Sequence, residues 1–420
     1  MVIFYDSFFI LFAVIYFPYL CLKGKWHNDF VMRFGFFPGS LRRSISSRKN
    51  IWVHAVSVGE VLAVAKLIRG IKEQYPSHQI VVSTVTTTGF KMACLNFPQD
   101  IVIYAPVDFS FSVNRYIKLI SPQLYIAAET EIWPNLFHAL SKKSVPIIQV
   151  NGRISDKAFN RYRLVQFILR PILNCVRLFC VQSEQDAKRI IALGAKEKNV
   201  RITGNMKFDD LPEMDGPALE NLGLNEGDAV LVGGSTHPGE EEILVNIFRE
   251  LSKEFSSLRL IIAPRHIERA DDIFKLIEKQ GLRAQKFSQI KNEKPQGRPV
   301  IVVDAMGHLR LLYKLAKIVF VGKSLTKRGG QNIIEPACFA KPIIVGPWTE
   351  NFKDVVNIFA RERSIIQVND ERELLNEVRN LLKDPQQAQR LGSLAKNVVQ
   401  KNQGATKRTL EIITKEAALA

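Results

Sequence analysis

Cysteine is scarce in this sequence, and its pattern argues against two kinds of site. The five cysteines are scattered over 420 residues, at Cys21, Cys94, Cys175, Cys180 and Cys338. No pair has the Cys-x-x-Cys spacing and the number is odd, which argues against a structural zinc site and against a disulfide framework. Such a composition fits a reducing compartment. The histidines also lack the spacing of metal ligands, so we expect no metal site.

Several catalytic motifs are absent as well. The chain has no G-x-x-x-x-G-K-[ST] loop and no G-x-S-x-G turn, which argues against a P-loop enzyme and an α/β-hydrolase. No Asp-x-Asp motif follows an expected strand. The adjacent acidic pairs Asp209-Asp210 and Asp271-Asp272 are expected in a linker and on a helix surface. A diphosphate sugar donor often needs a metal, whereas a monophosphate donor need not. The absence of a metal motif therefore favours a CMP-sugar and no cofactor.

Acidic residues are outnumbered by basic ones. The chain has 41 Asp and Glu against 58 Lys and Arg, which gives a formal net charge of +17. A charge of this size indicates the type of partner and says little about the fold. Nucleic acid, anionic lipid head groups and a phosphorylated substrate all fit it. Because no nucleic-acid recognition motif occurs, we expect no nucleic-acid partner.

The first 22 residues are apolar apart from Asp6 and Ser7. A helix that spans a bilayer needs roughly 20 apolar residues, so residues 1–22 suffice for an N-terminal membrane anchor. Basic residues follow this segment, which places the remainder of the chain in the cytoplasm and suits anionic lipid head groups. A buried or interfacial helix is the alternative, and Pro18 and Asp6 favour it.

Short apolar runs alternate with amphipathic stretches along the rest of the chain. Runs rich in Val, Ile and Leu that are separated by helices are typical of parallel sheets buried on both faces. The expected strands are residues 51–56, 79–85, 101–106, 123–129, 145–151, 177–183 and 199–205, and then 229–235, 258–265, 299–305, 317–323 and 341–347.

The two sets of strands predict two α/β domains. An acidic stretch broken by Pro and Gly separates them and is interpreted as a linker at residues 211–228. The first Rossmann-like domain then covers residues 23–210 and the second covers residues 229–420, with a cleft between them. Ligands of such sheets bind beyond the carboxyl ends of the strands.

Acidic residues follow two expected strands of the first domain. Glu60 lies near the first turn of the helix after residues 51–56, where the helix dipole would keep it ionised as a general base. Its alternative role is to cap that helix. Glu129 and Glu131 follow residues 123–129, and one of the two is expected to be structural.

Three strand ends of the second domain suggest an anion site. Gly233 through Glu241 join a strand to a helix, Arg265 follows the next strand, and a glycine-rich segment runs from Gly329 to Glu335. Glycines before a helix can bind phosphate, Arg can grip it, and Glu335 can accept hydrogen bonds from ribose. Each turn alone also fits an ordinary connection, but together they predict a site for a nucleotide-sugar donor.

The chain resembles the bacterial transferases of Kdo (3-deoxy-D-manno-octulosonic acid) in lipopolysaccharide assembly. The resemblance runs from about residue 20 to residue 400. It rests on an ordered series of motifs: RFGFFP, HAVSVGE, ETEIWPN, NGRIS, VQSEQDAKRI, GNMKFD, GGSTHPGEE, PRHIERA, VDAMGHLRLLY, FVGKSL, GGQNIIEPA and KPIIVGP.

This resemblance implies a GT-B glycosyltransferase at the bacterial inner membrane. It implies an inverting, metal-independent transfer of Kdo from CMP-Kdo to lipid IVA, a lipid A precursor in the membrane. The family's catalytic base falls on Glu60 and its second acid on Glu129. The implied CMP contacts are Pro264, Arg265, Met306, Gly307, His308, Asn332, Ile333, Ile334 and Glu335. Further residues of the same cleft are Lys207, Ser235, Thr236 and His237.

Three positions depart from the family pattern. Gln331 replaces a His, Lys323 replaces a Gly, and Gly152 replaces an Ala between Asn151 and Arg153. Gln331 cannot titrate, and Lys323 adds a cation near the expected donor phosphate.

The basic residues of the first domain leave two interpretations open. They suit an acceptor with two phosphates, or they form a solvated helix face. They are Arg153, Lys157, Arg161, Arg163 and Arg170.

Two other functions fit part of the pattern. One is a GT-B glycosyltransferase or an epimerase that uses a UDP-sugar, and the other is a membrane-bound nucleotide-binding protein without catalytic activity. Glu60 at its strand end argues against the second.

Overall fold

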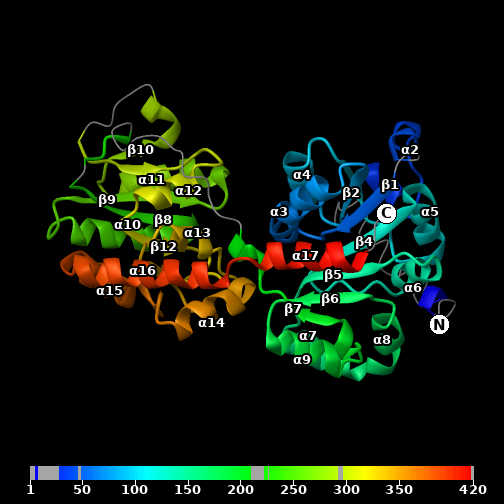
Figure 1. The fold of residues 1–420 in the computed structure, drawn as a ribbon. Helices are drawn as coiled ribbons and strands as arrows, with labels where there is room; N and C mark the ends of the chain where they lie inside the picture. Colours follow the sequence, from blue (N-terminus) through cyan, green and yellow to red (C-terminus); the bar gives the residue numbers. More distant parts are fainter. Residues whose placement is uncertain are drawn as a thin grey trace. The chain divides into compact units, whose positions relative to one another are not determined.

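The structure is a computed structural model that describes residues 5–7, 28–45, 49–209, 222–225, 227–291 and 297–417. The chain forms two compact units (Figure 1). The first comprises Met1–Asp210 with Gln403–Ala420, and the second comprises Leu211–Asn402. Most of the expected linker, residues 211–228, lies outside the described residues.

The described part of the first unit contains a parallel sheet of seven strands in the order β3-β2-β1-β4-β5-β6-β7. The strands are β1 (Lys49–His54), β2 (His78–Thr84), β3 (Ile101–Tyr104), β4 (Pro122–Ala128), β5 (Ile147–Gly152), β6 (Leu178–Val181) and β7 (Val200–Ile202). Their residues are mostly buried because helices cover both faces. Trp52 is fully buried in β1, and its indole N–H donates to Ser83 Oγ at 2.8 Å.

Helices alternate with these strands along the chain (Figure 1). They are α2 (Gly39–Ile45), α3 (Val58–Gln74), α4 (Thr87–Asn96), α5 (Ser110–Ile120), α6 (Pro134–Lys142), α7 (Asp156–Leu164), α8 (Gln166–Leu173) and α9 (Glu184–Ala192). Short 3₁₀ helices are η1 (Asn28–Phe34), η2 (Glu197–Asn199) and η3 (Met206–Asp209).

The C-terminal helix α17 (Ala405–Ala417) belongs to the first unit, whereas we expected residues 229–420 to form one domain. The carboxylate of Asp209 accepts backbone N–H bonds from Gly404 and Thr406, both at 2.6 Å, at the start of α17. The helix also packs on α3, where a side chain at Gly70 would meet Leu410. The chain therefore returns to the first unit after it completes the second.

The described part of the second unit contains another parallel sheet of seven strands, in the order β10-β11-β9-β8-β12-β13-β14. They are β8 (Ala229–Thr236), β9 (Leu258–Pro264), β10 (Ala284–Lys286), β11 (Val300–Val302), β12 (Ile318–Val321), β13 (Ile343–Val345) and β14 (Ile366–Gln367). The helices are α10 (Glu240–Leu251), α11 (Ala270–Lys279), α12 (Leu309–Leu315), α13 (Ile334–Cys338), α14 (Lys353–Arg361), α15 (Glu371–Lys383) and α16 (Pro385–Asn402).

Two parallel-sheet α/β units confirm the doubly wound α/β part of the predicted fold class. The strand order of the first sheet reverses between β1 and β4, and that of the second reverses between β8 and β12 beside its central strand β8. Ligands of doubly wound sheets bind beyond the carboxyl ends of the strands at such a point. The residues that follow these four strands are therefore the first candidates for a site.

The predicted anchor at residues 1–22 lies outside the described residues except for residues 5–7. Asp6 there accepts hydrogen bonds from the Ser110 backbone N–H at 3.2 Å and from Asn135 Nδ2 at 2.7 Å. Within the described ranges, no helix has the length and apolar character needed to cross a membrane. This finding contradicts the predicted inner-membrane localisation through a spanning anchor, and we withdraw that prediction.

Candidate active site

Glu60 lies at the point where the strand order of the first unit reverses. It is the third residue of α3, which follows β1, and its side chain is nearly buried. One carboxylate oxygen accepts the Val56 backbone N–H at 2.8 Å, and the other accepts the Ser57 hydroxyl at 3.0 Å. Glu60 thus ties down the start of its own helix, the structural role that the sequence left open, and it remains 8% exposed.

The proton affinity of Glu60 differs from our expectation. We predicted that the helix dipole would keep this carboxylate ionised. Burial instead raises the pKa of Glu60 to about 7, and the nearby charge of Glu129 acts in the same direction. A carboxylate with a pKa near neutral pH can accept a proton and release it again, which is the property of a general base.

Glu129 follows β4, the strand beside β1, and pairs with a lysine. Its backbone is left-handed, with φ at 52°, and its N–H donates to the Val150 carbonyl at 2.8 Å. One oxygen of its carboxylate accepts a hydrogen bond from Lys207 Nζ at 2.8 Å. A non-glycine residue in this conformation is strained and persists where the surroundings hold it. The structure thus brings the predicted residues Glu60, Glu129 and Lys207 to one edge of one sheet.

A third acid belongs to the same cluster. Burial raises the pKa of Glu131 to about 7, and the charge of Glu129 contributes to the increase. We expected one of Glu129 and Glu131 to be structural, without a means of choosing. Glu129 has a cation as its partner, whereas Glu131 has a pKa raised to the same range as that of Glu60, and the charge of Glu131 also raises the pKa of Glu60.

Asn151 positions Lys207, and sequence reasoning missed this role. Asn151 lies at an irregularity near the end of β5 and has a left-handed backbone, φ 55°, and its Oδ1 accepts the Met206 backbone N–H at 3.0 Å. This bond fixes the first residue of η3, which carries Lys207 next. A signal was present, because Asn tolerates the left-handed region better than most residues.

The basic residues around α7 and α8 are mostly exposed. Lys157, Arg161, Arg163 and Arg170 lie at the surface, and α7 contains no buried residue. Two large apolar side chains, Leu164 and Phe167, are 80% and 77% exposed beside them. This surface therefore combines cations with apolar side chains.

The glycines of β8 have a packing role that we did not expect. A side chain at Gly233 would collide with Leu244, and one at Gly234 would lie 2.1 Å from the Tyr313 hydroxyl. Both residues belong to the strand itself, so they do not form the anion-binding turn that we predicted. Ser235 and Thr236 are the last residues of the strand, His237 follows it, and Thr236 is fully buried.

Glu240 binds together two loops at the point of strand reversal in the second unit. Its side chain is fully buried. One oxygen accepts the backbone N–H groups of His237 and Lys323, both at 2.8 Å, and the other accepts those of Ser324 and Leu325 at 2.9 and 3.0 Å. The loop after β8 and the loop after β12 therefore share one carboxylate. Sequence reasoning placed Glu240 in a motif but assigned it no role.

Arg265 follows β9 on the other side of β8. Its backbone N–H donates to the Thr236 carbonyl at 3.0 Å, and its side chain is exposed. The residue before it, Pro264, is buried and pairs with Thr236 in the sheet. The structure thus brings Arg265 next to the Ser235–His237 segment.

The Asn332–Glu335 segment is only partly a helix start. Helix α13 begins at Ile334 and has five residues, so the dipole that it could offer to an anion is weak. Ile333 and Ile334 are buried, and they could meet a ligand only through their backbone. Glu335 is half-buried. Its Oε1 accepts a hydrogen bond from Asn332 Nδ2 at 3.2 Å and lies 3.7 Å from Arg310 Nε.

The remaining predicted contacts follow β11. Met306 is 80% exposed, and Gly307 has a left-handed backbone with φ at 89°. His308 packs against Phe287, with ring centroids 4.6 Å apart, and precedes α12. These three residues form a separate part of the same sheet edge.

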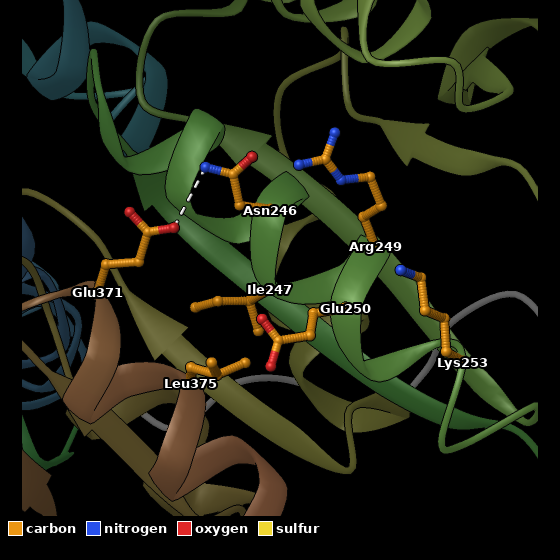
Figure 2. Close-up of a pocket in the computed structure, with 7 residues that line it drawn as sticks. All are labelled: Asn246, Ile247, Arg249, Glu250, Lys253, Glu371 and Leu375. Carbon is orange, nitrogen blue, oxygen red and sulfur yellow. Dashed lines mark hydrogen bonds between the residues drawn. The ribbon is translucent and has the colours of Figure 1, made fainter.

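A pocket elsewhere on the second unit has no predicted site residue in its lining. It lies between α10 and α15, and Figure 2 shows Arg249, Lys253, Glu250 and Glu371 around it, with Asn246 bonded to Glu371. Its lining residues come from α10, the turn that follows it, and α15, so it is not a strand-end site. Within the described residues, no group of His, Cys, Asp or Glu is arranged to hold a metal ion.

Comparison with known proteins gives a family for this chain. A family model described as 3-deoxy-D-manno-octulosonic-acid transferase (kdotransferase) matches residues 28–210. The 3-deoxy-D-manno-octulosonic acid transferase of Haemophilus influenzae is 32% identical over 398 residues, which are 93% of this chain and 91% of the relative. The Aquifex aeolicus transferase of the same name is 30% identical over 349 residues, 83% of this chain and 89% of the relative.

Solved structures show the same type of fold. The UDP-GlcNAc 2-epimerase of Neisseria meningitidis, bound to UDP-GlcNAc, aligns with a TM-score of 0.58 over 87% of this chain and all of its own. Its sequence is 11% identical, so this likeness shows only the GT-B-like fold. The identity to the transferases extends over most of both chains and confirms the resemblance predicted from the motifs. The chain belongs to the 3-deoxy-D-manno-octulosonic acid transferase family and is a glycosyltransferase.

Proposed function

We propose that this enzyme transfers Kdo from CMP-Kdo to a hydroxyl of a lipid A precursor, lipid IVA, with inversion at the anomeric carbon and without a metal. The observation that carries the proposal is the cluster of Glu60, Glu129 and Lys207 at the strand reversal of the first unit. The second unit supplies the cations and hydrogen-bonding groups for the donor.

Glu60 is the proposed general base. A pKa of about 7 leaves a useful fraction of Glu60 ionised at neutral pH and makes it a good proton acceptor. The acceptor hydroxyl gives its proton to Glu60, and its oxygen forms a bond to the Kdo anomeric carbon. The bond from that carbon to the phosphate oxygen breaks on the opposite face, and CMP leaves as an anion. The transition state has oxocarbenium character, as in other glycosyl transfers.

The donor nucleotide is proposed to bind the strand-end residues of the second unit. Arg265 is exposed and would pair with the CMP phosphate as charge develops on it. Glu335 would accept hydrogen bonds from the ribose hydroxyls, since Asn332 and Arg310 hold its carboxylate in place. The other proposed contacts surround these two: Pro264, Met306, Gly307, His308, Asn332 and the backbone of Ile333 and Ile334.

The acceptor is proposed to bind the exposed basic surface of α7 and α8. Lys157, Arg161 and Arg163 offer charge to two phosphates, and Leu164 and Phe167 offer apolar area to acyl chains. The combination favours a phosphorylated lipid over the solvated helix face that the sequence left open.

The test is incubation of the purified full chain with CMP-Kdo and lipid IVA dispersed in detergent, followed by mass analysis of the lipid. We expect products heavier by whole Kdo residues, together with release of CMP, and the same yield in the presence of a metal chelator. A lipid of unchanged mass would contradict the proposal. Loss of the product with the chelator would contradict metal independence alone.

The fold likeness to an enzyme that binds UDP-GlcNAc keeps one rival open, a reaction on a UDP-sugar. Competition separates the two donors. CMP should inhibit Kdo transfer and raise the melting temperature, whereas UDP at the same concentration should do neither. A preference for UDP would favour the rival. Binding of either nucleotide without turnover of any sugar donor would favour a non-catalytic nucleotide-binding protein.

A further inference from the structure

Lys323 lies at the strand reversal of the second unit in a conformation that favours glycine. It follows β12 after a single residue, and its φ is 56°. A left-handed backbone costs free energy in any residue that has a Cβ atom. Glycine has none and avoids this cost. A side chain kept in such a position points to a functional role, because the strain persists only where the surroundings hold it.

The surroundings hold Lys323 through its backbone. Its N–H donates to Glu240, and its carbonyl accepts the Gly330 N–H at 2.6 Å. The next two residues, Ser324 and Leu325, also donate their N–H groups to Glu240. The loop that presents Lys323 is therefore fixed to the strand end of β8 by a buried carboxylate.

The Lys323 side chain lies across Gly329. A Cβ at Gly329 would be 2.7 Å from Lys323 Cε and 3.1 Å from its Cδ, so the absence of a side chain there leaves the path of the lysine open. Gly329 itself has φ at 142°. The stem of Lys323 is thus packed, and its ammonium group is directed by that packing.

The positive charge of Lys323 lacks a protein counter-ion in the described part of the chain. The carboxylate that binds its backbone, that of Glu240, already accepts four backbone N–H groups. Glu241 is not available as a counter-ion for Lys323 either, because it forms an ion pair with Arg269 at 2.6 Å. Burial lowers the pKa of His237 to about 4, and the charge of Lys323 contributes to this decrease. A rigid, unneutralised cation at this edge is the property of an anion-binding group.

We propose that Lys323 binds the carboxylate of the donor's acidic sugar, an inference that rests on the proposed function. In a 2-ulosonic acid donor, the anomeric carbon carries both the carboxylate and the phosphate ester oxygen, so two anionic groups lie side by side. Arg265 follows β9 and Lys323 follows β12, on opposite sides of β8. Two long cationic side chains from opposite sides can pair with two adjacent anions, Arg265 with the phosphate and Lys323 with the carboxylate.

Lys323→Met tests this assignment because it removes the charge and keeps the stem that packs on Gly329. Steady-state kinetics would give KM for CMP-Kdo, kcat, and the inhibition constant of CMP, which lacks the carboxylate. We expect KM for CMP-Kdo to rise about 10- to 100-fold, the effect of losing a charge-assisted contact, while the CMP constant stays within about twofold. Lys327→Met is the matched control, since Lys327 is exposed in the same loop. It should change neither constant more than about twofold.

Three results would overturn the assignment. An equal rise in both constants for Lys323→Met would mean that the lysine binds the phosphate. No change in either constant would mean that it binds no part of the donor, and an equal loss in Lys327→Met would mean that the general charge of the loop is responsible. Lys323→Gly relieves the left-handed backbone, so it should fold at least as well as the parent and show the same kinetic split.

Failure of the proposed function would look different. The unchanged enzyme would then neither bind CMP nor transfer Kdo, and the variants would have no parent activity to alter. A functional parent with an unaltered Lys323→Met variant would contradict only the carboxylate site.

Discussion

Glu60 and Glu240 occupy the same place in the two units, yet their environments differ. Each lies in the first turn of the helix that follows the first strand of its sheet in chain order, β1 or β8. Glu60 accepts one backbone N–H and one hydroxyl, whereas Glu240 accepts four backbone N–H groups. Glu240 therefore holds two loops together through four donors, whereas Glu60 caps the start of a single helix through two.

The two sheet edges also differ in charge. The edge of the first unit gathers Glu60, Glu129 and Glu131, and burial together with the charge of Glu129 raises the pKa of Glu60 and of Glu131. The edge of the second unit presents Arg265 and Lys323 with its acids already engaged. A proton acceptor belongs in the first environment and an anionic leaving group in the second. These two electrostatic environments support the proposal that the first unit supplies the base and the second binds the donor.

The largest effect is expected from Glu60→Gln, which removes the base but keeps an oxygen that can cap α3. Loss of a general base typically lowers the rate by 10²- to 10⁴-fold, so we expect kcat to fall at least that far. The inhibition constant of CMP should stay near the parent value, because the proposed CMP site lies in the other unit. Glu60→Ala should lose turnover as completely, with about 1 kcal/mol of additional destabilisation from the lost cap. Turnover near the parent rate in the Gln variant would remove the assignment.

Glu240→Gln should lower the free energy of unfolding of the second unit. The amide offers one acceptor oxygen, and its NH₂ group would face backbone N–H groups that need an acceptor. Leaving buried donors unpaired costs about 1–3 kcal/mol each, so we expect a loss of about 2–4 kcal/mol in the unfolding of the second unit, measured by denaturant titration. Glu242→Gln is the matched control, since Glu242 is exposed in the same turn, and it should change stability by less than about 0.5 kcal/mol. Equal stability of the two variants would contradict the structural role of Glu240.

Local pattern was enough for most of the fold. All twelve expected strands occur, because long apolar runs between helices are characteristic of buried parallel strands. Strands β10 and β14 were missed, since they have three and two residues and lack an apolar run. The assignment of α17 to the first unit depends on Asp209 and its bonds to Gly404 and Thr406, which lie 195 and 197 residues away along the chain. No local pattern encodes that contact.

The candidate site, like the fold, has a part that the sequence predicts and a part that it does not. The rule that ligands bind at strand ends selected Glu60, Glu129 and Arg265 from the sequence. It did not reveal that Glu240 bonds Lys323 across 83 residues, nor that Asn151 bonds Met206 across 55. The pKa of Glu60 depends on burial by distant segments, so the helix-dipole argument, which uses only neighbouring residues, predicted the wrong direction.

The pH dependence of kcat/KM sharpens the comparison between the acids. A base must be deprotonated to act, so activity should rise with pH through about 7, the pKa of Glu60, and level off above it. Glu131 titrates in the same range, and Glu131→Gln removes that second group. We expect the rising limb to persist in Glu131→Gln, displaced by less than about one pH unit. Disappearance of the limb in this variant would transfer the role of base to Glu131.

The smallest effect is expected from Lys207→Met, and it separates two roles of this lysine. Lys207 pairs with Glu129 at 2.8 Å in the first unit, although the sequence resemblance placed it among the donor contacts. Its side chain and that of Glu129 are 21% and 24% exposed, so the pair itself contributes only about 0–1 kcal/mol to stability. If Lys207 acts through Glu129, its removal leaves an unpaired negative charge near Glu60 and raises the pKa of that base. The rising limb should then move to higher pH by less than about one unit, while the rate on the plateau stays within about threefold. If Lys207 instead contacts the phosphate, the plateau itself should fall and the limb should stay in place, because a lost transition-state contact lowers the rate at every pH.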